Sequence, residues 1–301
     1  MSRVLVTGAT GFLGRHLCRV LKLHGDEITA VGSKKWDDIC CLKLGANFDY
    51  IYHLAAYTQG GDWCLTHAGE QWLANQKINT DILMFWKKHS PRAKFITIGT
   101  SCAYVPSFNQ VESDYLRGEP HESLFVYAMV KRMLLMGCEA LHKQFGLNYL
   151  YIVPSTVYGT DYHVRNDRQL HFIFDLVRKI IRGKELGEQV ILWGDGNQHR
   201  ELVYIDDFVE TLLKLKNANA SGIFNIGGED GTIRHFAEEI CRQVGYNHAD
   251  VIYDETKFVG APVKVLNKEK TESVLGKCSQ FPVSDGIHTL IEWYYATGVW
   301  K

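Results

Sequence analysis

Tyr127 and Lys131 are four residues apart, a spacing that places both side chains on the same side of a helix. A free tyrosine, with a pKa of about 10, is a poor base at neutral pH, but a neighbouring ammonium group lowers that pKa. The pair therefore predicts proton exchange with the oxygen of a carbinol or ketone while hydride moves to or from its carbon. A hydroxyl from Thr100 or Ser101 would hydrogen-bond the same oxygen.

Position along the chain distinguishes this pair from Tyr253 and Lys257, which repeat the spacing. Tyr127 opens a predicted helix over residues 127–145, shortly after a predicted strand over 94–99. The helix start and the strand end can meet at the carboxyl edge of a sheet, so we interpret Tyr253 and Lys257 as a chance repeat.

Three glycines near the N-terminus predict the element that would hold the hydride carrier. A short apolar strand over residues 2–7 is followed by Gly8, Gly11 and Gly14, and then by helical periodicity over 15–21. Gly8 allows the sharp turn, Gly11 lets a pyrophosphate approach the backbone, and Gly14 lets the helix pack closely. The pyrophosphate would lie at the helix N-terminus, on residues Thr10, Gly11, Phe12, Leu13 and Gly14.

Strands and helices alternate through the first half of the chain. Apolar runs predict strands over 28–32, 50–56, 94–99 and 149–153, and amphipathic runs predict helices over 72–89 and 127–145. Near-continuous apolar strands between helices indicate an α/β fold with a doubly wound parallel (Rossmann) sheet. We expect residues 1–158 to form the dinucleotide-binding domain, with the sheet completed by about 200–227. Residues 159–301 would mostly form a smaller, interleaved substrate-binding lobe.

The residues after the second predicted strand bear on the choice of dinucleotide. An NAD site usually has an acid there for the ribose hydroxyls, whereas this chain has Ser33, Lys34 and Lys35 and no acid before Asp37. These three residues could hold a 2′-phosphate, which favours NADP over NAD. Alternatively, they form an ordinary solvated loop.

The composition excludes several other classes. The chain has 301 residues, 46% hydrophobic and 22% charged, and a net charge of −1, which gives no general attraction to nucleic acid or anionic membranes. It has no signal segment or membrane-spanning run, so we expect a cytoplasmic protein. We also expect its eight cysteines to be reduced. No cysteine or histidine spacing suggests a metal site.

Motifs along nearly the whole chain resemble those of extended short-chain dehydrogenases/reductases, in the nucleotide-sugar epimerase/dehydratase family. They are Thr7–Gly14, His53–Ala56, Thr100–Tyr104, the Tyr127/Lys131 pair, Pro154–Gly159 and Trp193–Asp207. The resemblance implies further cofactor contacts from Leu54, Ala55, Ala56, Pro154, Thr156 and Val157, and from Tyr127 and Lys131 themselves. It also implies a nucleotide-sugar substrate bound by His171, Lys179, Trp193, Arg200 and Lys264, with Arg200 on the diphosphate.

Ser101 and Cys102 bear on the reaction that the resemblance implies. Dehydratases of the family carry Asp-Glu directly after the hydroxyl residue that matches Thr100, so dehydration is not expected. The Ser-Cys-x-Tyr pattern is instead similar to the GDP-4-keto-6-deoxymannose 3,5-epimerase-4-reductases, the GDP-L-fucose synthase group. In that group a cysteine and a later histidine, matching Cys102 and His171, move protons at C3 and C5. Inversion needs a base and an acid on opposite faces of the carbon, and a thiolate with an imidazole can supply them.

Other interpretations stay open at this point. Cys102 could be a small buried residue and His171 a structural residue at a helix start, which would leave a nucleotide-sugar 4-reductase or 4-epimerase without C3 or C5 chemistry. A non-catalytic NADP-binding protein is a further alternative, although it would commonly have lost Tyr127 or Lys131. Apolar residues on more than one face of the 72–89 and 127–145 helices predict a homodimer formed through them.

Overall fold

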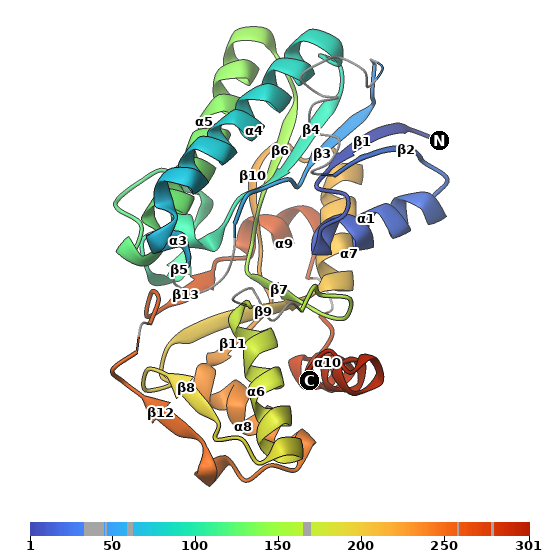
Figure 1. The fold of residues 1–301 in the computed structure, drawn as a ribbon. Helices are drawn as coiled ribbons and strands as arrows, with labels where there is room; N and C mark the ends of the chain where they lie inside the picture. Colours follow the sequence, from blue (N-terminus) through green and yellow to red (C-terminus); the bar gives the residue numbers. More distant parts are fainter. Residues whose placement is uncertain (33–44, 46, 59–62, 165–169, 258, 278–279) are drawn as a thin grey trace.

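The computed structural model describes the chain except for residues 33–44, 46, 59–62, 165–169, 258 and 278–279 (Figure 1). Its central element is a six-stranded sheet with the strand order β10-β6-β4-β3-β1-β2, in which every adjacent pair is parallel. The strands are β1 (Arg3–Thr7), β2 (Glu27–Val31), β3 (Tyr50–His53), β4 (Lys94–Ile98), β6 (Tyr149–Pro154) and β10 (Gly222–Ile226). The predicted α/β fold with a doubly wound parallel sheet is confirmed.

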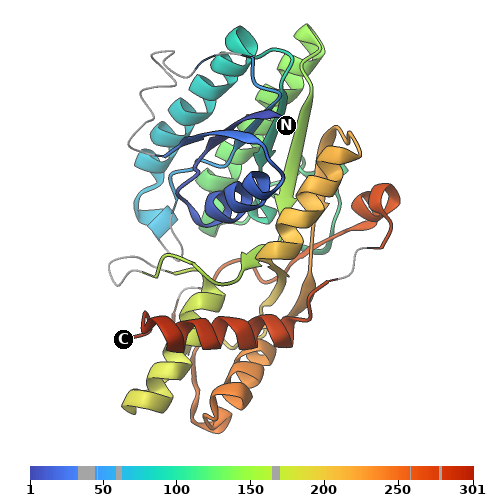
Figure 2. The ribbon, with the colours of Figure 1, turned by 90° about the vertical axis from the view of Figure 1, so that its right-hand side faces the viewer.

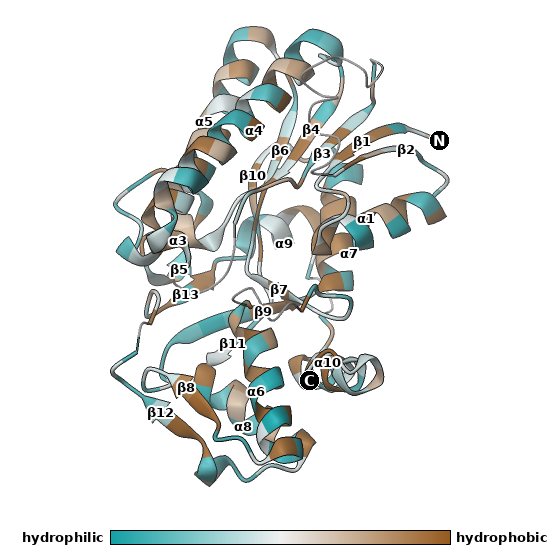
Figure 3. Ribbon diagram, viewed as in Figure 1, coloured by the Kyte–Doolittle hydropathy of each residue, from teal (hydrophilic) through white to brown (hydrophobic). Residues whose placement is uncertain are grey.

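Helices cover both faces of this sheet (Figure 1). Alternate residues of β1 face opposite ways: Leu5 packs in the core beneath one helix pair, and Val4 and Val6 pack in the core beneath the other. The first pair is α4 (Ala68–His89) and α5 (Phe125–Phe145), and the second is α1 (Phe12–Leu23) and α7 (Ile205–Asn217). Apolar residues accordingly run along the strands, whereas the helices alternate apolar and polar residues (Figure 3).

A second lobe lies below the sheet and has its own apolar core (Figure 1). Its helices are α6 (Phe172–Leu186), α8 (Ile233–Val244) and α10 (Val283–Thr297), and α10 runs across the side of the molecule below α1 (Figure 2). Two small sheets complete this part of the chain. They consist of β7 (Thr156–Tyr158), β9 (His199–Tyr204) and β11 (Glu229–Thr232), and of β8 (Ile191–Trp193) and β12 (Ile252–Asp254).

A late segment of the chain returns to the edge of the first lobe. Strand β13 (Lys264–Leu266) pairs in parallel with β5 (Ser107–Gln110), and α9 (Glu269–Leu275) follows it beside β10. The remaining short elements are α3 (Trp63–Thr66) and the 3-10 helices η2 (Ser101–Ala103), η3 (Glu112–Asp114), η4 (Glu122–Leu124) and η5 (His248–Asp250). Among the described residues, no helix is long and apolar enough to cross a membrane.

The chain reverses its direction across the sheet between β1 and β3, which are neighbours. In open parallel sheets, ligands bind beyond the carboxyl ends of the strands at such a switch point. The residues that follow β1, β3, β4 and β6 are therefore the ones to inspect.

Candidate active site

The glycine-rich turn after β1 leaves no room for a side chain at Gly8 or Gly14. Gly8 has a φ of 69°, and a Cβ there would lie 2.7 Å from the backbone nitrogen of Ala55. A Cβ on Gly14 would lie 2.2 Å from the carbonyl oxygen of Gly8. The turn therefore packs against the chain after β3, and the start of α1 packs against the turn.

The start of α1 suits an anion. Gly11 precedes Phe12 as the N-terminal cap without a side-chain capping bond, and the first turn has no acidic residue. The backbone N–H groups around Phe12 and Leu13 and the positive end of the helix dipole therefore face the turn without competition from a carboxylate. These features fit the pyrophosphate of a dinucleotide.

The other predicted cofactor residues lie at the same edge or outside the described part of the chain. Leu54 and Ala55 contact the glycine turn through their backbone atoms, and Ala56 follows them in an exposed position. Pro154 ends β6, while Thr156 and Val157 lie in β7, where the chain leaves the sheet for the second lobe. Ser33, Lys34 and Lys35 lie outside the described residues.

The tyrosine–lysine pair lies in the first two turns of α5. Lys131 is buried, its ammonium donates a hydrogen bond to the carbonyl of Ile98 at the end of β4 (2.7 Å), and its Nζ lies 5.9 Å from the ring centre of Tyr127. Burial lowers the pKa of Lys131 to about 8. By contrast, Tyr253 lies on β12, a strand, with its ring beneath the guanidinium of Arg234.

The pKa of Tyr127 differs from the expectation. The sequence predicts a pKa lowered by Lys131, but burial, followed by the negative charge of Cys102, raises it above its ordinary value. The Lys131 ammonium donates to the Ile98 carbonyl and lies 5.9 Å from the centre of the Tyr127 ring, and its charge does not offset the effect of burial. A phenol that keeps its proton at neutral pH suits donation to a substrate oxygen, which is the direction of reduction.

Thr100 and Cys102 lie in a tight turn at the end of β4. The Thr100 hydroxyl accepts a hydrogen bond from the Cys102 backbone N–H (3.3 Å) and thereby caps η2. The buried Arg132 holds this turn to α5 by donating two hydrogen bonds to the Ala103 carbonyl (2.9 and 2.6 Å). Its other bonds go to the carbonyls of Arg117 and Gly118. The sequence analysis missed Arg132, because nothing in the sequence marks an arginine that binds distant carbonyls.

Cys102 belongs to a group of four polar residues beside this turn, whose other members are Lys264, His171 and Arg200. The Nζ of Lys264, on β13, lies 3.4 Å from the Sγ of Cys102. Burial raises the pKa of the Cys102 thiol, but Lys264, Thr100 and Arg200 together outweigh burial and leave that pKa below its ordinary value. At a given pH these neighbours therefore increase the thiolate fraction of Cys102 relative to an ordinary thiol. Sequence reasoning assigned Lys264 to substrate binding and missed this contact.

His171 and Arg200 complete the group. His171 occupies the N-cap position of α6 without a side-chain capping bond. Desolvation of its ring by the surrounding protein, followed by the charges of Lys264 and Arg200, lowers its pKa to about 3. Arg200 is buried on β9, and within the described residues its side chain donates a hydrogen bond only to the carbonyl of His199 (2.7 Å). A buried guanidinium without a carboxylate partner in the described chain suits an anionic ligand such as a diphosphate.

Lys179 and Trp193 come together at a separate place in the second lobe. The Nζ of Lys179 lies 5.8 Å from the ring centre of Trp193 and 2.9 Å from the carboxylate of Asp175. Trp193 is 39% exposed at the end of β8. An accessible indole beside a lysine could stack on a base, while Asp175 already partly neutralises this lysine.

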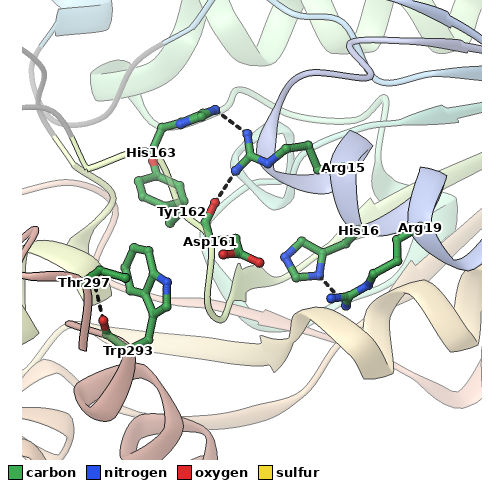
Figure 4. A pocket seen from close by; sticks show the side chains of 8 residues that line it. All are labelled: Arg15, His16, Arg19, Asp161, Tyr162, His163, Trp293 and Thr297. Atoms are coloured by element: carbon green, nitrogen blue, oxygen red, sulfur yellow. Dashed lines mark hydrogen bonds between the residues drawn. The ribbon is translucent and has the colours of Figure 1, made fainter. Parts of the chain in front are cut away.

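A cavity of about 520 Å³ lies between α1, the loop after β7 and α10 (Figure 4). Arg15 points into it from the first turn of α1 and bonds the Thr10 carbonyl on one side and the Asp161 carbonyl and His163 on the other. Arg19 is paired with Asp206 (3.3 Å). The arginines of this cavity thus already have partners, and Arg15 joins the glycine turn to the second lobe.

The doubly wound sheet, the glycine turn at its switch point and the buried Tyr127/Lys131 pair define a short-chain dehydrogenase/reductase. The sequence model of the NAD dependent epimerase/dehydratase family matches residues 4–227, and the chain belongs to that family. It is an NAD(P)-dependent enzyme of the nucleotide-sugar epimerase/oxidoreductase type.

Individual relatives agree with this assignment. The chain is 26% identical to "GDP-L-fucose synthase" of Escherichia coli (strain K12), over 97% of this chain and 96% of the relative. It is 25% identical to "GDP-L-colitose synthase" of Yersinia pseudotuberculosis, over 93% and 97%. The likeness to GDP-L-fucose synthase expected from the sequence is confirmed.

Solved structures share the fold. A GDP-L-fucose synthetase from Naegleria fowleri bound to NADP superposes with a TM-score of 0.83 at 21% identity, covering 99% of this chain and 93% of the other. A GDP-mannoheptose C4 reductase from Campylobacter jejuni with NADP bound gives a TM-score of 0.83 at 18% identity, covering 98% of both chains.

Proposed function

We propose that the protein is an NADP-dependent epimerase-reductase that acts on a GDP-4-keto-6-deoxyhexose. The observation that carries this proposal is the contact between Cys102 and Lys264, in the same tight turn that the Thr100 hydroxyl caps. A plain hydride-transfer site does not need a thiol beside an ammonium group. A thiolate stabilised by an ammonium group is one of the groups that can act as a base on the acidic C–H bonds beside a ketone.

The proposed roles follow from the geometry. Arg200 would bind the diphosphate of the substrate. The Cys102 thiolate would remove a proton from the carbon alpha to the ketone, and His171 would return a proton to the opposite face. Burial and the charges of Lys264 and Arg200 keep His171 neutral in the free protein, and a substrate diphosphate on Arg200 would offset one of these charges and favour the protonated imidazole. NADPH, when bound, supplies the hydride for C4. Tyr127 would donate the proton to the C4 oxygen, with Thr100 hydrogen-bonded to that oxygen and Lys131 holding the end of β4.

The preference for NADP and for a GDP-sugar rests on two kinds of support. The acid-free stretch Ser33, Lys34 and Lys35 suits a 2′-phosphate, and two structures with this fold have NADP bound. The relatives described above are named for GDP-sugars. Comparing the dissociation constants of NADPH and NADH tests the cofactor.

A 4-reductase without C3 or C5 chemistry is the second candidate, supported by the similar GDP-mannoheptose C4 reductase. The test is to mix the protein with NADPH and GDP-4-keto-6-deoxymannose, follow NADPH absorbance, and determine the stereochemistry of the product by NMR. Inverted centres at C3 and C5 support the epimerase-reductase. NADPH consumption with retained centres supports the reductase, and no consumption contradicts both.

The homodimer is also a proposal. Large apolar residues lie exposed on the two helices predicted to form the interface, namely Leu73 and Met84 on α4 and Met133 and Met136 on α5. The same helices of a second copy would cover them across a two-fold axis. We expect Leu73→Glu combined with Met136→Glu to give a monomer in sedimentation experiments, and an unchanged mass would contradict this interface.

A further inference from the structure

Glu201 is a buried acidic residue that the proposed reaction does not use. Burial raises its pKa to about 7, while the N–H groups of Leu266 and Gly228 and the ammonium of Lys268, 3.9 Å from Oε1, favour the carboxylate. Glu201 lies on β9 directly after Arg200 and is 2% exposed. Successive residues of a strand point to opposite faces. Arg200 accordingly lies near Cys102, as their mutual electrostatic influence shows, while Glu201 points away from the site.

Glu201 bonds two separate segments of backbone. One oxygen accepts a hydrogen bond from the Gly228 N–H (2.8 Å) after β10, and the other accepts one from the Leu266 N–H (3.0 Å) at the end of β13. A Cβ on Gly227 would lie 2.3 Å from Glu201 Oε1, so the glycine is needed for this approach. The side chain thus joins the six-stranded sheet, β9 and β13.

The bond to Leu266 matters because Lys264 is in the same short strand. Val263, just before β13, forms a parallel β-bridge with His199 of β9. Three residues later the backbone N–H of Leu266 bonds the Glu201 side chain instead of a backbone carbonyl of β9. On its other side β13 has β5, which pairs with Lys264 at Ser107. The backbone of Lys264 is therefore fixed on one side by strand pairing with β5 and, two residues later, by the hydrogen bond of Leu266 to Glu201, which we call the Glu201 tether.

We propose that Glu201 is a positioning residue that holds Lys264 against Cys102. Both carboxylate oxygens are needed, because each accepts from a different N–H and neither N–H can turn away. A glutamine would present an NH₂ group to one of these donors, and that half of the tether would be lost. The inference rests on the proposed function only for the importance of the cysteine, not for the geometry.

The experiment measures the pH dependence of Cys102 alkylation by iodoacetamide in the intact, cofactor-loaded protein, with the Cys102 peptide followed by mass spectrometry. We compare Glu201→Gln with Glu229→Gln, a control at an exposed glutamate whose carboxylate also accepts a hydrogen bond from a backbone N–H (Val283, 3.4 Å) at a different segment. Lys264→Met serves as the reference for complete loss of the ammonium.

We expect Glu201→Gln to shift the alkylation profile to higher pH, toward that of Lys264→Met, and to slow alkylation about three- to tenfold at neutral pH, since one pKa unit is a factor of ten. The alkylation profile of Glu229→Gln should match that of the wild type, and both variants should bind NADPH with wild-type affinity. A wild-type profile in folded Glu201→Gln would overturn the inference.

A second measurement covers the case in which Glu201→Gln does not fold. Hydrogen exchange on the wild-type protein should then show the Leu266 and Gly228 amides protected to a similar degree, and rapid exchange at Leu266 would overturn the tether. Alkylation needs no substrate. A wild-type protein that fails to invert C3 or C5, but shows the shifted profile in Glu201→Gln, would contradict the proposed function and leave this inference standing.

Discussion

The sulfur of Cys102 and the ammonium nitrogen of Lys264 lie 3.4 Å apart, although 162 residues separate them in the chain. One comes from the turn after β4 and the other from the late strand β13. The ammonium favours the thiolate over the thiol, and the thiolate is the form that can act as a base.

Lys264→Met removes this ammonium and should raise the pKa of the Cys102 thiol. We expect alkylation of Cys102 at neutral pH to slow about tenfold for each unit by which the pKa rises, with NADPH affinity unchanged. Lys270→Met is the control, because Lys270 is exposed and bonds the Ile223 carbonyl (2.7 Å) rather than a group at the sulfur or at Glu201. Equal profiles for Lys264→Met and the wild type would show that the contact does not control the thiol.

Tyr127→Phe should abolish proton donation to the C4 oxygen and slow NADPH-dependent reduction about 10²- to 10⁴-fold, a typical range for loss of a general acid. Tyr253→Phe has the same local spacing to a lysine but lies on β12, so it should retain wild-type turnover. Steady-state rates and NADPH titrations of both variants check this. A Tyr127→Phe variant with near-normal turnover would remove Tyr127 from the mechanism.

Arg132→Met should destabilise the protein and disturb the Cys102 turn. The variant leaves the carbonyls of Ala103, Arg117 and Gly118 without their donor, and an unsatisfied buried group costs about 1–3 kcal/mol. Urea unfolding should therefore show a free energy of unfolding lower by about 2–5 kcal/mol, less than the full sum because these carbonyls are partly accessible to water. Arg242→Met, at an exposed arginine that is paired with Glu239, should leave the midpoint unchanged. Equal midpoints for the two variants would argue against the clamp.

The burial of His53 leads us to expect that the free energy of unfolding decreases as the pH is lowered. Its ring is buried between the Thr7 hydroxyl (2.7 Å) and the Asn79 carbonyl oxygen (3.1 Å), and burial lowers its pKa to about 3. Between about pH 6.5 and 3 the unfolded chain therefore binds a proton that the folded chain does not. The stability contribution of neutral His53 is present above that window and falls as the pH drops through it.

The expected slope is about 1 kcal/mol between pH 6 and 5 from this residue alone. Urea titrations at both pH values measure it, and His53→Gln should reduce the difference. His288→Gln, at an exposed histidine of α10, should retain it. A wild-type pH dependence in His53→Gln would contradict this account.

The sequence predicted the elements whose signals are local. The glycine turn, the alternation of apolar strands with amphipathic helices and the Tyr127/Lys131 spacing each fall within one short stretch. The structure accordingly confirms the parallel sheet and places the turn at its switch point. Strands such as β7, β12 and β13 have three residues each, too few to carry a period of two, and were not predicted individually.

The contacts that tune the site could not be predicted from the sequence. The pairing of Lys264 with Cys102 depends on β13 returning to β5, and Arg132 finds its carbonyl partners only once the 103–118 segment has folded over α5. The pKa of Tyr127 went the opposite way from the expectation, because the sequence shows that Lys131 is near but not that its ammonium is bound to Ile98. Burial then decides the sign.

Deuterium incorporation tests the central claim most directly. GDP-4-keto-6-deoxymannose is incubated with the protein in D₂O without NADPH, and the sugar is analysed by NMR and mass spectrometry. We predict deuterium at C3, C5 or both with the wild type and with Tyr127→Phe, and none with Cys102→Ser. A wild-type protein that reduces the ketone with NADPH, yet incorporates no deuterium at either carbon, would contradict the epimerase role of Cys102 and leave a simple 4-reductase.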